Sequence, residues 1–375
     1  MDSFLHGLYL DLERRCVVLE ERLADPKLHP DVREHARDAR ANLAKVRRDI
    51  RANVDDPSFQ DASLATTYAQ IYRRLQEEVS LTQRLVVPAI ERYSAADAKL
   101  TALVRRLGRE VKWPYRTTPL VVSSSDGAYF TTLGLDIISV NAGDDDLLLA
   151  WPDIAHEMAH ILYSRERPQL LGKFVASLER YSDAAKAQFP GLSREVGGEL
   201  LAAYSRGWME ELVCDMVATY LLGPSFGGQQ VRQAAGRSVS VYQHRSNHPS
   251  YDSQLRAITS VLDEMGHASD ASEVTRLWSD MVAARQDVKS SLYDKTAPAP
   301  LLAELARNVI AGCKALGLTP FDSPAHGPRS VPGVLSAVWK RFVAQPGGYS
   351  AWEAANVPEF WRQLGLGGQD GQQVA

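Results

Sequence analysis

The sequence has few cysteines and no long apolar run, and each scarcity excludes a class of protein. Its 375 residues include three cysteines, Cys16, Cys214 and Cys313, and an odd, scattered set argues against a disulfide framework. No stretch of about 18 to 20 residues is free of charge, so no segment is suited to crossing a bilayer. The N-terminus also lacks the basic and apolar regions of a signal peptide. We therefore expect a cytoplasmic protein without a membrane span.

The sequence has no excess of positive charge. Lysine and arginine number 42 against 46 aspartates and glutamates, which gives a formal net charge of −4. A basic run between residues 33 and 51 is interleaved with acidic side chains, as on a solvated helix face. Nucleic acid is therefore not expected as a partner.

The first third of the chain lacks strand signals and reads as helical. Apolar stripes predict helices over residues 2–24, 30–52 and 62–110, the last broken or kinked at Pro88. Residues 1–112 are thus predicted to form a helical hairpin or small bundle. Two interpretations stay open, a structural cap and an arm that gates access or binds a protein partner.

A single pentapeptide carries the main functional signal. Residues 156–160 read His-Glu-Met-Ala-His, within a segment from Trp151 to Tyr163 whose apolar spacing predicts a helix. Residues four apart share a helix face, so His156 and His160 can bind one metal ion, with Glu157 beside its open side. Candidate strands at 119–123 and 133–141 precede the helix.

A catalytic zinc usually takes three protein ligands and one water, so a third ligand is needed. The apolar helical segment 207–222 carries three carboxylates, which its composition does not explain. Glu211 and Asp215 share a face, so we predict that Glu211 binds zinc while Asp215 accepts the second N–H of a ligating histidine. Glu210 is expected to point elsewhere.

These residues resemble the gluzincin metallopeptidases, in which H-E-x-x-H is followed on a later helix by E-x-x-x-D. The spacing and the later His248-Pro249 are similar to the CAAX-endopeptidase-type branch, although this chain is not membrane-embedded and Arg256 comes late. The resemblance covers residues 119–262. It implies a zincin-like fold and a Zn²⁺ cofactor held by His156, His160 and Glu211, with Asp215 behind them.

The chemistry expected of such a site is hydrolysis of a peptide or protein substrate. Glu157 would take a proton from the attacking water and deliver it to the leaving amine. His248 is the first candidate for the donor that stabilises the oxyanion, and His244, Tyr242 and Tyr251 remain alternatives. The peptide is expected to extend beside the strand at 136–141.

We therefore predict a mainly α (α+β) protein in which a zincin-like domain with a small edge sheet spans residues 113–265. An N-terminal bundle, a C-terminal helical region at 266–364 and a disordered tail at 365–375 would flank it. The predicted function is a zinc-dependent metallopeptidase, more an endopeptidase than an exopeptidase. The alternatives are a zinc-binding pseudoenzyme that serves as a helical interaction module, and a helical scaffold without metal.

Overall fold

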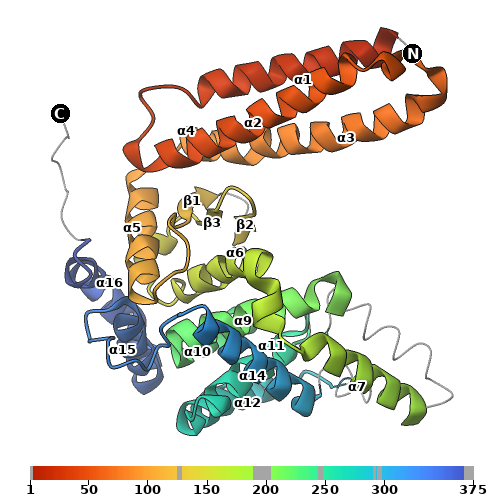
Figure 1. Ribbon diagram of the computed structural model, residues 1–375. Coiled ribbons are helices and arrows are strands. Elements are labelled where there is room, and N and C mark those ends of the chain that lie inside the picture. Colours follow the sequence, from red (N-terminus) through yellow and green to blue (C-terminus); the bar gives the residue numbers. More distant parts are fainter. Residues whose placement is uncertain are drawn as a thin grey trace.

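The computed structural model describes residues 3–124, 129–188, 204–243, 248–289, 293 and 298–366. Within these ranges it is mainly helical and contains one small three-stranded sheet, as predicted (Figure 1). The predicted tail lies, from residue 367 onward, outside the described residues. None of the helices in the described ranges combines the length and the hydrophobicity that a bilayer crossing requires.

Three long helices form the N-terminal unit, at the top of Figure 1. They are α1 (Ser3–Arg22), α2 (Arg33–Val54) and α3 (Ala65–Leu81), followed by the short α4 (Val87–Glu91). Their apolar stripes meet in a core around Leu12, Leu43 and Leu75, each at most 1% exposed. The bundle is therefore held together by the periodic positions that predicted it.

The predicted helix over 62–110 is distorted beside Pro88, as expected, and it also ends earlier than expected. A π-helical turn at Thr82–Val86 lies directly before α4, whose first turn contains Pro88. The helical run ends at Arg92, because Ser94 begins a new helix, α5 (Ala95–Glu110). Ser94 is the N-cap of α5 and forms a capping box with Asp97.

The sheet has the order β1-β3-β2. Its strands are β1 (Leu120–Ser124), β2 (Phe130–Thr132) and β3 (Ile137–Asn141). β3 pairs parallel with β1 and antiparallel with β2, so it is the central strand. The expectation that a peptide extends beside residues 136–141 is therefore wrong, because both edges of β3 are already paired. Within the sheet the free edge nearest α6 belongs to β2, which the sequence did not predict.

The sheet separates two apolar cores. Leu120, Val122 and Ile137 face the N-terminal bundle, whereas Val121 and Ile138 face a larger core. Helix α5 contributes its buried side chains to the larger core, although the predicted N-terminal region, residues 1–112, includes it. It packs on β1, where Asp97 accepts a hydrogen bond from the Ser123 amide at 2.6 Å.

The larger core is built around one long helix, α6. Its elements are α6 (Pro152–Leu171), α7 (Phe174–Gln188), α9 (Met209–Leu222), α10 (Pro224–Ala235), α11 (Tyr251–Glu264), α12 (Ala268–Arg285), α14 (Ala299–Ala315), α15 (Val331–Ala344) and α16 (Pro346–Gln363). Helix α6 packs against α9 and α14. A Cβ on Gly312 of α14 would lie 2.6 Å from the carbonyl oxygen of Gln169, so glycine permits the close approach.

The C-terminal helices brace the start of α6 and form part of the same core. Trp151, the residue before α6, packs against Trp361 of α16 with ring centroids 4.6 Å apart. Glu353 of α16 accepts hydrogen bonds from the Leu148 amide and the Tyr349 hydroxyl. These contacts fix the entry of the chain into α6 and thereby the position of its side chains.

Candidate metal centre

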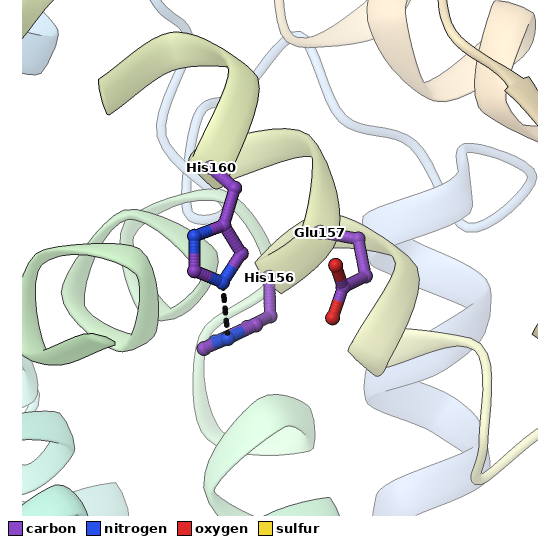
Figure 2. Close-up of side chains that lie close together, drawn as sticks. All are labelled: His156, Glu157 and His160. Atoms are coloured by element: carbon purple, nitrogen blue, oxygen red, sulfur yellow. Dashed lines mark hydrogen bonds between the residues drawn. The ribbon is translucent and has the colours of Figure 1, made fainter. Parts of the chain in front are cut away.

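Two imidazoles meet on one face of α6. His156 and His160 lie one helical turn apart, and their Nε2 atoms are 3.2 Å from each other (Figure 2). The Glu157 side chain lies beside His156, and one of its carboxylate oxygens and a nitrogen of each histidine lie within 4.8 Å of one another. The helix thus brings together the three residues that the sequence motif singled out.

Glu211 reaches the same point from α9. Its Oε2 atom lies 3.5 Å from Nε2 of His156, and its Oε1 atom lies 3.9 Å from Nε2 of His160. A carboxylate is therefore presented to both imidazoles on the side where their Nε2 atoms meet. Glu211, the predicted third ligand, is thus close enough to both histidines to bind the same metal ion as they do.

Asp215 lies one turn further along α9 and contacts the other nitrogen of His156. Its Oδ1 atom is 2.9 Å from Nδ1, and its Oδ2 atom accepts a hydrogen bond from Gln254 of α11. Asp215 is fully buried, and its contact with His156 has the distance of an ion pair, while neither Oδ1 nor Nδ1 has a partner with hydrogen-bond geometry within the described residues. Asp215 thus lies beside Nδ1 of His156, and its role as the acceptor of an N–H from a ligating histidine stays a prediction.

Glu210 does not point elsewhere, contrary to expectation. Its Oε1 atom lies 2.9 Å from Nδ1 of His160. Consecutive helical residues point about 100° apart, and Glu210 and Glu211 use this divergence to contact different nitrogens of the histidine pair. Each histidine therefore has a carboxylate at Nδ1, and the sequence argument found one of the two because it considered only i, i+4 pairs.

Thr131 is a further residue that sequence reasoning missed. It lies on β2, and its hydroxyl is 2.8 Å from Oε2 and 2.9 Å from the backbone oxygen of Glu157. These contacts connect the sheet to α6 and hold the Glu157 carboxylate in place. No motif marks Thr131 in the sequence.

A cavity of about 370 Å³ opens onto these side chains and is lined also by Leu133, Tyr129 and His248. Nε2 of His248 lies 3.4 Å from Oε1 of Glu211, and the side chain is about half exposed. Of the alternatives, His244 lies outside the described residues, and Tyr251 is buried in the first turn of α11. Among the candidates that the structure describes, His248 lines the cavity, whereas Tyr242 and Tyr251 do not.

Burial and charge act against each other at the site. Burial disfavours the charged form of His156, but Asp215 and Glu211 outweigh it, so the pKa of His156 is raised well above its ordinary value. Burial also acts to raise the pKa of Glu211, yet His156 lowers it to about 2. The Glu211 carboxylate is consequently ionised throughout the neutral range.

The donor set fits a divalent metal ion. Without a metal ion, the two Nε2 atoms share a hydrogen bond at 3.2 Å, so one of them carries a proton. A metal ion bound to both Nε2 atoms would displace that proton, and the carboxylates beside the two Nδ1 atoms would favour the remaining proton of each ring there. Two nitrogens bound to one tetrahedral zinc at about 2.0–2.1 Å lie about 3.3 Å apart. Two neutral imidazoles and a carboxylate are, moreover, a common ligand set for zinc.

Comparisons with protein families, with curated proteins and with solved structures found no match to this chain.

Proposed function

We propose that this protein is a zinc-dependent metallopeptidase with a zincin-like catalytic unit. One observation carries the proposal. The Nε2 atoms of His156 and His160 converge at 3.2 Å while each Nδ1 faces a carboxylate, and two further carboxylates, Glu157 and Glu211, stand beside the point of convergence. A purely structural hydrogen bond between the two histidines would require neither the further carboxylates nor an adjoining cavity.

His156, His160 and Glu211 would hold the zinc ion, and Glu157 remains outside the ligand set. Glu211 is favoured over Glu157 as the third ligand because it contacts both imidazoles, whereas Oε2 of Glu157 is engaged by Thr131. A zinc ion in such a site supplies the Lewis acidity that hydrolysis of an amide requires.

Glu157 would act as the general base and then the general acid. Its carboxylate lines the cavity, so it can take a proton from an attacking water molecule and pass it to the leaving amine. The Thr131 hydroxyl would orient the Glu157 carboxylate and would take no part in the proton transfer itself. His248 lines the same cavity and would donate to the developing oxyanion.

A peptide substrate would lie along the free edge of β2. Phe130, Thr131 and Leu133 line the cavity, so an extended chain pairing with this edge would pass the candidate metal ligands. The alternative is a zinc-binding pseudoenzyme that has the same ligands but no turnover.

Substitution of Glu157 separates the enzyme from the pseudoenzyme. We expect wild-type protein to cleave members of an internally quenched peptide library and Glu157→Gln to lose this activity while retaining its zinc content and melting temperature. Glu179→Gln, an exposed change on α7, is the matched control and should behave as wild type. Zinc binding without any cleavage by the wild-type protein would favour the pseudoenzyme, and full activity in Glu157→Gln would refute the proposed mechanism.

A further inference from the structure

A second cavity adjoins the candidate metal centre. It has a volume of about 410 Å³ and shares Tyr129 with the first cavity as a wall. Asp153 on its floor lies three and four residues before His156 and Glu157, on the same face of α6. A ligand that extends from the metal centre toward the N-terminus of α6 would therefore enter this cavity.

Two arginines line the second cavity, and both have guanidinium groups available to a ligand. Arg232 lies on α10 and Arg237 in the turn after it. Arg232 donates a hydrogen bond to Oε1 of the neutral Gln229 at 3.1 Å. Among the described residues, neither arginine forms an ion pair with a carboxylate within 4.0 Å.

The acidic groups of this cavity are already engaged. Asp144 accepts hydrogen bonds from the Tyr129 hydroxyl at 2.6 Å and from Asn141 at 3.1 Å. Asp153 is buried and accepts a hydrogen bond from Gln229 at 2.7 Å, and burial raises its pKa to about 7. Arg232 is close enough to Asp153 to lower its pKa, but neither Asp144 nor Asp153 is among the carboxylates that form an ion pair with an arginine within 4.0 Å in the described ranges, so both guanidinium groups keep donors for a ligand.

The turn that carries Arg237 is fixed by a third arginine. Arg285, at the end of α12, donates to the backbone oxygens of Arg237 at 2.6 Å and Val239 at 2.7 Å. Its Nε atom donates to Asp287, whose Oδ2 atom also accepts the Val241 amide. These hydrogen bonds fix the backbone of the turn and thereby keep Arg237 beside the cavity.

We propose that the second cavity binds a carboxylate group of the ligand through Arg232 and Arg237, and so selects substrates that carry a negative charge at one side of the scissile bond. Guanidinium groups match the planar geometry of a carboxylate and form its stronger hydrogen bonds. The carboxylate belongs to an aspartate or glutamate side chain or to the C-terminus of the substrate. The statement about substrates depends on the proposed peptidase function, whereas the carboxylate site itself does not.

Binding to an inactive protein tests the proposal without requiring turnover. The probes are short fluorescein-labelled alanine peptides with a single Glu or Gln at successive positions, each made as the C-terminal acid and the amide. We expect full-length Glu157→Gln protein to bind at least one carboxylate peptide about tenfold more tightly than its neutral counterpart. Preference for Glu over Gln identifies a side-chain carboxylate, and preference for acid over amide identifies the C-terminus.

The added change Arg232→Gln/Arg237→Gln should reduce this preference to less than about twofold, because it removes both charged donors. The added change Arg276→Gln, which breaks an exposed ion pair with Asp280 on α12, is the control and should keep the preference. Equal affinity for all peptides, no binding, or a preference that survives the double change would overturn the inference. Zinc content and wild-type hydrolysis are measured separately, so their failure would refute the peptidase function and leave an arginine-dependent preference standing.

Discussion

Oε1 of Glu210 lies 2.9 Å from Nδ1 of His160, in the same relation that Asp215 has to His156. Helix α9 therefore provides a carboxylate for the Nδ1 atom of each histidine as well as the predicted ligand Glu211. Such partners fix the tautomer and the orientation of a ligating imidazole and raise its basicity. Both carboxylates should consequently contribute to metal affinity although neither is a ligand.

We expect Glu210→Gln to weaken zinc binding by about tenfold, at the lower end of the range for such partners, because its side chain is about one-third exposed and water can replace it. Competition with a chromogenic chelator measures the affinity. The control is Glu77→Gln on the exposed face of α3, which should leave the affinity unchanged. Equal affinity in Glu210→Gln and wild type would show that the contact with His160 is incidental.

Asp215→Asn should have the larger effect, about 100-fold in zinc affinity. Asp215 is fully buried between His156 and Gln254, so water cannot substitute for the lost charge. The same titration, with circular dichroism to verify folding, compares the two variants. A smaller loss for Asp215→Asn than for Glu210→Gln would contradict this ranking.

Thr131→Val should lower kcat by about tenfold and leave zinc affinity unchanged, since it removes the hydroxyl that holds the Glu157 carboxylate and no ligand. Thr132→Val, at the next position of β2, controls for the loss of a hydroxyl from the same strand. Steady-state kinetics on a peptide found by library screening, with metal analysis, provide the test. Wild-type kcat in Thr131→Val would remove Thr131 from the account.

The buried Asp153 should make the metal-free protein less stable as pH rises. Burial raises its pKa from 3.8 to about 7, so the folded state binds a proton more tightly than the unfolded state. The stability that protonated Asp153 contributes is fully present below the pKa that it has in the unfolded state, and it is lost as pH rises toward and through about 7. We expect the free energy of unfolding to fall by on the order of 2 to 3 kcal/mol between about pH 5 and about pH 8. Urea unfolding should show this loss in wild type and a smaller one in Asp153→Asn. A steeper pH dependence in the variant would contradict the assignment.

The parts of the site that depend on local geometry could be predicted from the sequence. The positions of His156, Glu157 and His160 follow from helical spacing alone, and so does the shared face of Glu211 and Asp215. Glu210 could not be placed, because its contact depends on how α6 and α9 pack against each other. Thr131 could not be found either, since β2 has only three residues and no alternating pattern that a sequence argument could recognise.

In the fold, too, the features that depend on local sequence could be predicted, and those that depend on packing between distant residues could not. Periodic apolar positions predicted the helices of the first third, but Ser94 and its capping box decided where α5 begins. The order of the strands depends on pairing between distant residues, so β3 could not be recognised as the central strand. The roles of the N-terminal bundle as a cap or as an arm for a protein partner stay predictions.

The most direct test of the central claim is to locate the metal. Crystals of full-length protein purified without chelator, measured on both sides of the zinc absorption edge, should give an anomalous peak about 2.0 to 2.3 Å from Nε2 of His156, Nε2 of His160 and a carboxylate oxygen of Glu211. Metal analysis of the same preparation should find about one zinc per chain. Absence of a peak at these side chains, with zinc supplied in the medium, would contradict the account.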